Sequence, residues 1–87
     1  MEILKISSKS NPNLVAGALV NLLKENKRVE MHSIGAGATN QAIKSLAIAR
    51  GFLVPGGIDL SFVPSFLEVV IDGKNKTAMR IVIEKKW

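Results

Sequence analysis

The chain of 87 residues has no cysteine, and its aromatic residues are only three Phe and one Trp. Without cysteine it can form no disulfide, thiolate nucleophile or sulfur-ligated zinc site, so a reducing cytoplasm is the expected location. The scarcity of aromatic side chains disfavours an RNA-binding sheet that stacks bases on exposed rings. The core must therefore be built from Ile, Leu, Val and Ala.

Long hydrophobic runs are also missing. No segment approaches the roughly 20 apolar residues of a membrane span. The opening MEILKISS lacks the apolar stretch of a signal peptide. We therefore expect neither a membrane span nor a signal peptide. The hydrophobic fraction of 47% suffices for a folded core, and the length allows one domain, assigned to residues 1–87.

Acidic residues are in the minority. Seven Asp or Glu stand against twelve Lys or Arg, which gives a net charge of +5. An excess of this size favours a polyanionic partner such as DNA or RNA, although solubility alone would also account for it. The charges are scattered, so the location of a basic surface depends on the fold.

The order of elements follows from the periodicity of apolar residues. Alternating apolar and polar residues predict strands, whereas spacings of three and four predict helices. Asp72-Gly73 predicts a tight hairpin between the last two strands. The expected strands cover residues 2–8, 29–34, 58–72 and 77–84, and the expected helices cover residues 12–26 and about 40–52.

Two prolines constrain these elements. Pro12 fits the first turn of the first helix, where its missing N–H costs nothing, with Ser10 or Asn11 as the cap. Pro64 lies inside the third strand and cannot donate a ladder hydrogen bond, so that strand is expected at an edge or interrupted. Two strand–helix units and a hairpin then predict an α/β protein of two-layer α+β type. It would have a mixed four-stranded sheet with both helices on one face.

The stretch IGAGATNQAIK, residues 34–44, carries the most distinctive local pattern. Gly35-Ala36-Gly37 is expected to turn the chain, and Thr39 or Asn40 to cap the second helix. A dinucleotide-binding fingerprint would need a third glycine where Asn40 stands, so that function is disfavoured. Two interpretations remain open. The glycines allow only a sharp turn and close packing, or the N–H groups at the helix start also bind a phosphate.

Candidate catalytic and metal-binding residues are few. His32 is the only histidine, and no second histidine or cysteine is present to share a metal. The serines have no base other than His32, and no close acidic pair suggests hydrolysis. We therefore expect a protein that is not an enzyme and that has no cofactor and no metal.

The basic residues indicate a phosphate-binding surface once they are placed on the expected fold. Loops after two parallel strands lie side by side, so Lys9 and the glycine turn are expected to share one surface. Binding to a nucleic-acid backbone requires positive charge rather than base recognition. The candidate nucleic-acid-binding residues are Lys9, Gly35, Gly37, Asn40, Gln41, Lys44, Lys74, Lys76 and Arg80.

Four segments resemble a known family. MEILKISSKSNPNLVAGAL, IGAGATNQAIKSLAIARGF, IDLSFVP and the run to IVIE are similar to the bacterial stage V sporulation protein S family. The order of elements more distantly resembles the Alba family of archaeal chromatin proteins, which are dimers that bind DNA and RNA. The resemblance implies an Alba-like fold, a homodimer, a protruding hairpin that follows a nucleic-acid backbone, and a role in sporulation.

The chain departs from the Alba pattern in both loops. Of the paired lysines before the first helix only Lys9 is matched, with Ser8 at the other position, and the basic turn before the second helix is replaced by Gly35-Ala36-Gly37. A scaffold module that binds protein partners after losing DNA affinity is therefore the alternative function. A metabolite-binding regulator that uses the glycine turn is a third.

Overall fold

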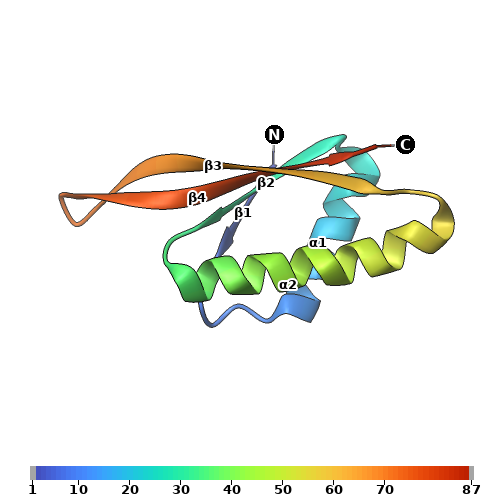
Figure 1. Ribbon diagram of the computed structural model, residues 1–87, viewed down its shortest axis with the longest axis horizontal. Coiled ribbons are helices and arrows are strands. Elements are labelled where there is room, and N and C mark those ends of the chain that lie inside the picture. The colour runs from blue at the N-terminus through green and yellow to red at the C-terminus, as the bar shows by residue number, and fades with distance from the viewer. Residues whose placement is uncertain (1, 87) are drawn as a thin grey trace.

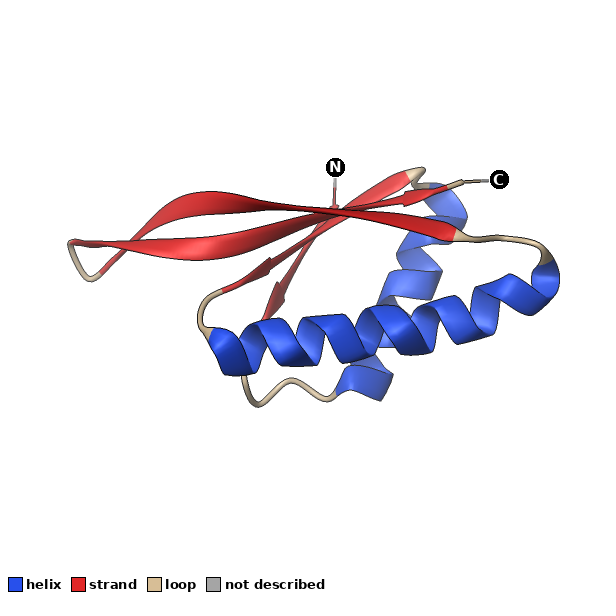
Figure 2. Cartoon of the chain, viewed as in Figure 1, coloured by secondary structure: helices blue, strands red, loops and turns tan. Residues whose placement is uncertain are grey.

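The computed structural model describes residues 2–86 as two layers, a four-stranded sheet with both helices on one face (Figures 1 and 2). The observed class and element order are those predicted. In chain order the elements are β1 (Glu2–Ile6), α1 (Pro12–Glu25), β2 (Arg28–Ser33), α2 (Ala36–Leu53), the short 3-10 helix η1 (Val54–Gly56), β3 (Leu60–Ile71) and β4 (Lys74–Lys85).

The sheet is mixed, as expected, with strand order β1-β2-β4-β3. β1 and β2 run parallel, because α1 carries the chain back between them, whereas β4 is antiparallel to both of its neighbours. β3 lies at an edge and contains Pro64 opposite Ile81. The missing N–H of proline costs no ladder hydrogen bond on the open side of an edge strand, so the edge prediction is confirmed.

The core lies between the sheet and the two helices. β2 alternates strictly, so that Val29, Met31 and Ser33 point toward the helices and are almost completely buried. The α2 positions that face the sheet are small, with Ala42 and Ala49 fully buried, which lets this long helix pack closely. The other core residues are Ile6, Ala16, Leu19, Leu23, Leu46, Leu60, Ile81 and Ile83.

The first helix begins as predicted. Asn11 is its N-cap, and the Asn11 side-chain oxygen accepts hydrogen bonds from the backbone N–H groups of Asn13 and Leu14 at 2.9 and 3.3 Å. Pro12 follows in the first turn. The β1 strand ends at Ile6, two residues earlier than expected, because Ser7 and Ser10 close a turn. In that turn the Ser10 N–H donates to the Ser7 carbonyl at 3.1 Å.

Candidate nucleic-acid interface

The start of α2 differs from the sequence prediction. The cap is Gly35, with φ of 89°, and no side chain within residues 2–86 caps the helix. Thr39 and Asn40 instead lie one turn inside it, so their prediction as caps was wrong. The Thr39 hydroxyl lies 2.9 Å from the hydroxyl of buried Ser33 and so ties the helix to the end of β2. The glycine cap therefore leaves the first backbone N–H groups of α2 without a side-chain acceptor at the cap.

Gly37 brings α2 against the β1–α1 loop. A Cβ atom on Gly37 would lie only 3.1 Å from the Cβ of Ser8. Gln41, one turn further on, donates a hydrogen bond from its side-chain amide to the Ser10 carbonyl at 2.8 Å. The prediction that the two loops share one surface is therefore confirmed. One hydrogen-bond donor of the Gln41 side-chain amide is therefore already engaged within the protein.

Lys9 lies at the centre of this joint surface. Its backbone N–H donates to the Ser7 hydroxyl at 3.2 Å, so the loop conformation is fixed. The Lys9 residue itself is exposed, between Ser8, which contacts the start of α2, and Ser10, which accepts from Gln41. Lys9 is therefore an exposed residue of the loop that packs against the start of α2.

Asn40 and Lys44 are exposed on one face of α2, since residues four apart lie one above the other. Because the helix begins at Ala36 and not near residue 40, Lys44 is eight residues along it. At 1.5 Å per residue this is roughly 12 Å from the helix start. The sequence prediction placed Lys44 within one turn of the helix start. In the structure it lies two turns along the helix and not beside the N-terminal N–H groups.

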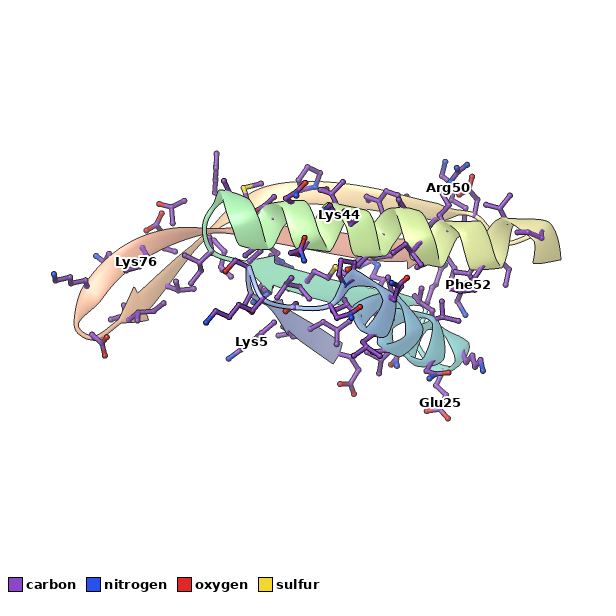
Figure 3. The ribbon with its side chains drawn as sticks, turned by 90° about the horizontal axis from the view of Figure 1, so that it is seen from below. Lys5, Glu25, Lys44, Arg50, Phe52 and Lys76 are labelled. Carbon is purple, nitrogen blue, oxygen red and sulfur yellow. The ribbon has the colours of Figure 1, made fainter. Side chains whose placement is uncertain are left out.

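The β3–β4 hairpin projects beyond the body at the end where α2 begins, and the 44 Å length of the molecule includes it (Figures 1 and 3). Its turn is made by Asp72 and Gly73, with φ of 52° and 75°. These are the positive values that a two-residue hairpin turn requires, so this prediction is confirmed. Lys74 and Lys76 are exposed on β4 just after the turn, and Figure 3 shows Lys76 well away from the helices.

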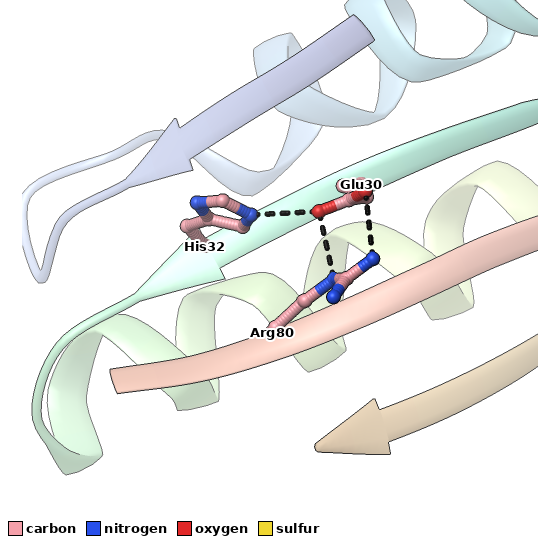
Figure 4. A network of polar contacts seen from close by, with 3 residues as sticks. All are labelled: Glu30, His32 and Arg80. Atoms are coloured by element: carbon pink, nitrogen blue, oxygen red, sulfur yellow. Dashed lines mark hydrogen bonds and ion pairs between the residues drawn. The ribbon is translucent and has the colours of Figure 1, made fainter. Parts of the chain in front are cut away.

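Arg80, unlike the hairpin lysines Lys74 and Lys76, has an acidic partner among the described residues. It forms an ion pair with the buried carboxylate of Glu30, with Nε and an NH2 nitrogen 2.9 and 3.1 Å from the two carboxylate oxygens (Figure 4). His32 approaches the same carboxylate through Nε2 at 2.9 Å. The hydrogen bond from His32, with the smaller effects of the hydrogen bond and charge of Arg80, holds the pKa of Glu30 below its usual value despite the opposing effect of burial. Much of the Arg80 charge is therefore compensated within the protein.

Asp59 also has an internal partner. Its carboxylate forms a two-point ion pair with Arg50, at 2.7 and 3.1 Å, and accepts from the Leu60 N–H at 2.7 Å. The Arg50 guanidinium and this backbone donor lower the pKa of Asp59 to about 2. The pair joins the end of α2 to the start of β3 and does not face the glycine turn.

The described part of the chain offers neither a metal site nor a membrane-spanning helix. Among residues 2–86 no group of three or more His, Asp or Glu side chains is placed to hold a metal ion. Within the same residues no helix has the length and apolar character needed to cross a membrane. The candidate site therefore consists of the two joined loops, the start of α2 and the hairpin.

Lys5 is a basic residue that the sequence prediction left out. It lies on the sheet face opposite the helices, directly across from His32, which in turn pairs with Arg80. Figure 3 shows Lys5 beside β1, where neither helix covers it in that view. The alternation within β1 indicates an exposed side chain, but only the strand order places Lys5, His32 and Arg80 in one row.

The arrangement of layers and the long hairpin define an Alba-like fold. Alba from Thermoplasma volcanium superimposes with a TM-score of 0.65 over 97% of this chain and 98% of that chain, at 13% sequence identity. That likeness shows the fold. The sequence is more specific: residues 2–86 match the model of the family Stage V sporulation protein S, and the chain belongs to that family.

Proposed function

We propose that this protein is a non-enzymatic nucleic-acid-binding protein that holds the sugar–phosphate backbone without reading base sequence. The observation that carries the proposal is the packing of the Lys9 loop against the start of α2, where a Cβ on Gly37 would lie 3.1 Å from Ser8. This contact packs the loop that carries the exposed residue Lys9 against the start of α2, and an ammonium group and helix N–H groups both favour a phosphate. Lys74 and Lys76 extend the positive charge along the hairpin at the same end.

The binding would serve bacterial development, in keeping with the family's name, and would take place in the cytoplasm. The basic side chains that carry it have different surroundings. Lys9, Lys74 and Lys76 have no acidic partner within the described residues, whereas Arg80 shares Glu30 with His32. We therefore assign the phosphate contacts to the three lysines and the start of α2, with Arg80 in a supporting position.

A homodimer is the proposed assembly. An apolar groove of about 320 Å³ lies between α2 and β3, lined by Ile43, Ala47, Phe62 and Pro64 among others. Ile43 is 53% exposed, and the neighbouring β3 residue Phe66 is 78% exposed. Apolar side chains clustered in this way on one surface are typical of a protein contact. A second copy joined here would provide two hairpins and double the number of phosphate contacts.

The test is binding of the purified protein to labelled duplex DNA and to single-stranded RNA over a series of salt concentrations. We expect micromolar or tighter binding whose logarithm falls linearly with the logarithm of the salt concentration. Lys9→Glu should abolish most of it, whereas Lys24→Glu, in the last turn of α1, is the matched control and should change little.

Absence of binding to both nucleic acids at low salt would overturn the proposal. The alternative is then a scaffold module, favoured by the exposed apolar groove and by the glycine turn that replaces the basic turn of the Alba pattern. In that case affinity capture with an Ile43→Asp variant as the comparison would show whether the groove holds a protein partner.

A further inference from the structure

A second hollow lies on the open face of the sheet, at the end where β1 and β2 finish and the hairpin continues. Its volume is about 500 Å³, within the range of ligand pockets. The apolar part of its lining comes from Ile34, Val69, Ile71 and Ala78, with Ala78 only 2% exposed. Lys5, Ser7, Ser8 and His32 supply the polar part.

The polar groups of this hollow are arranged around its apolar walls. Register places Lys5 beside His32, while Lys76 is directly across from Val69 and Lys74 directly across from Ile71. Lys5 thus lines the hollow, Lys74 and Lys76 stand across from two of its apolar residues, and no acidic residue lines it. Its chemistry therefore suits a ligand with an apolar, flat body and a negatively charged group at its edge.

His32 is held in a fixed orientation at this site. Its Nε2 lies 2.9 Å from Glu30, whose other partner is Arg80, so both carboxylate oxygens of Glu30 are engaged (Figure 4). The other ring nitrogen of His32, Nδ1, takes no part in this contact, and Ser7 and Ser8 also line the hollow. These are hydrogen-bonding groups of the kind that contact the edge of a nucleobase.

We propose that this hollow binds one unstacked nucleobase of a single-stranded nucleic acid, while Lys5, Lys74 and Lys76 hold the adjoining phosphates. The inference rests on the proposed function and adds a preference for single strands. A paired base in a duplex is stacked and cannot enter a hollow, whereas an unpaired base can be splayed out. The apolar walls take the place of the aromatic stacking platform that the chain lacks.

The experiment is methyl NMR on the full-length protein, labelled at Ile, Val and Ala. It is titrated separately with a short oligouridylate, a DNA duplex and free uridine monophosphate. With the single strand we expect shifts at the methyl groups of Ile34, Val69, Ile71 and Ala78. With the duplex, the backbone amides around Lys9 should shift while these methyl groups stay unchanged.

A variant separates the hollow from the rest of the binding surface. Lys5→Glu should weaken single-strand binding about tenfold at low salt and duplex binding much less, because only the strand passes over this face. Lys24→Glu is the control for net charge. Thermal unfolding of both variants checks that the fold is retained.

The outcomes distinguish this inference from the function on which it depends. Binding of both nucleic acids without shifts at the hollow methyl groups would overturn the inference and leave the proposed function intact. Saturation of those methyl groups by uridine monophosphate at a lower nucleotide concentration than by the strand would assign the hollow to a free nucleotide instead. Absence of any nucleic-acid binding would overturn both.

Discussion

Ser8 and Gly37 are packed so closely that a Cβ on Gly37 would lie 3.1 Å from the Ser8 Cβ. Ser8 belongs to the β1–α1 loop and Gly37 to the first turn of α2, and this contact joins the loop and the helix start into one surface. We expect the contact to be measurable as a coupling. Gly37→Ala should stabilise α2 by up to about 1 kcal/mol in a Ser8→Gly background, because alanine favours the helix. In the native background most of that gain should be lost.

The measurement is a double-mutant cycle by urea denaturation, with an expected coupling of about 0.5–1 kcal/mol. An equal effect of Gly37→Ala in both backgrounds would show that the loop can move away from the added methyl group without a loss of stability. In that case the close approach would not explain the glycine.

Gly35 is needed for a different reason, the backbone conformation at the cap of α2. Its φ of 89° is strained for any residue with a side chain, although a Cβ there would meet no atom within 4 Å. Gly35→Ala should therefore lower the free energy of unfolding by about 1–2 kcal/mol. Gly51→Ala is the matched control, since Gly51 lies in α2 with open space around it, and it should raise stability.

The Arg50–Asp59 pair should make the free energy of unfolding depend on pH. Because the folded-state pKa of Asp59 is about 2 and its ordinary value is 3.8, the unfolded chain takes up the proton first as the pH falls. The stabilisation is present above the ordinary value and is lost as the pH falls from about 4 toward 2. Asp59→Asn should give a shallower loss of stability over this interval than the native protein.

Thermal denaturation at stepped pH measures this effect. Asp72→Asn, in the hairpin turn, is the control, because asparagine tolerates the positive φ of 52° at that position. If both variants follow the native curve, the ion pair contributes nothing to acid stability.

Lys9 and Lys44 should contribute differently to nucleic-acid binding. Lys9 lies beside the start of α2, whereas Lys44 is roughly 12 Å along the helix. Lys9→Ala should therefore reduce affinity several-fold more than Lys44→Ala, as measured by fluorescence anisotropy at low salt. An equal loss from the two substitutions would indicate that the nucleic acid lies along α2 and not across its start.

The apolar groove beside α2 predicts how the protein associates. Ile43→Asp places a charge in the groove and should shift sedimentation equilibrium toward the monomer without unfolding the chain. Leu14→Asp on α1 is the control, since Leu14 is 74% exposed and does not line the groove. A native protein that is monomeric throughout the concentration range would contradict the proposed homodimer.

The sequence by itself determined the kind and order of the elements. Periodicity, the Asn11 cap, the Asp72-Gly73 turn and the Pro64 edge strand are local effects, each set by a few neighbouring side chains and their backbone preferences. The sequence prediction placed the start of α2 too late, because threonine is a favoured N-cap residue and Thr39 stands near the expected start. In the folded protein its hydroxyl contacts Ser33 instead, and a glycine conformation takes over the role of the cap.

Only the tertiary structure decided which charges are compensated and which are left for a partner. Arg80 meets Glu30 because β4 inserts between β2 and β3, and no periodicity within either strand encodes that neighbour. The same strand order sets Lys5 beside His32 and brings the hairpin next to the open-face hollow. Charge pairing depends on distances of a few ångströms between residues far apart in the chain. The sequence therefore provides the basic residues, and the fold determines which of them have an acidic partner.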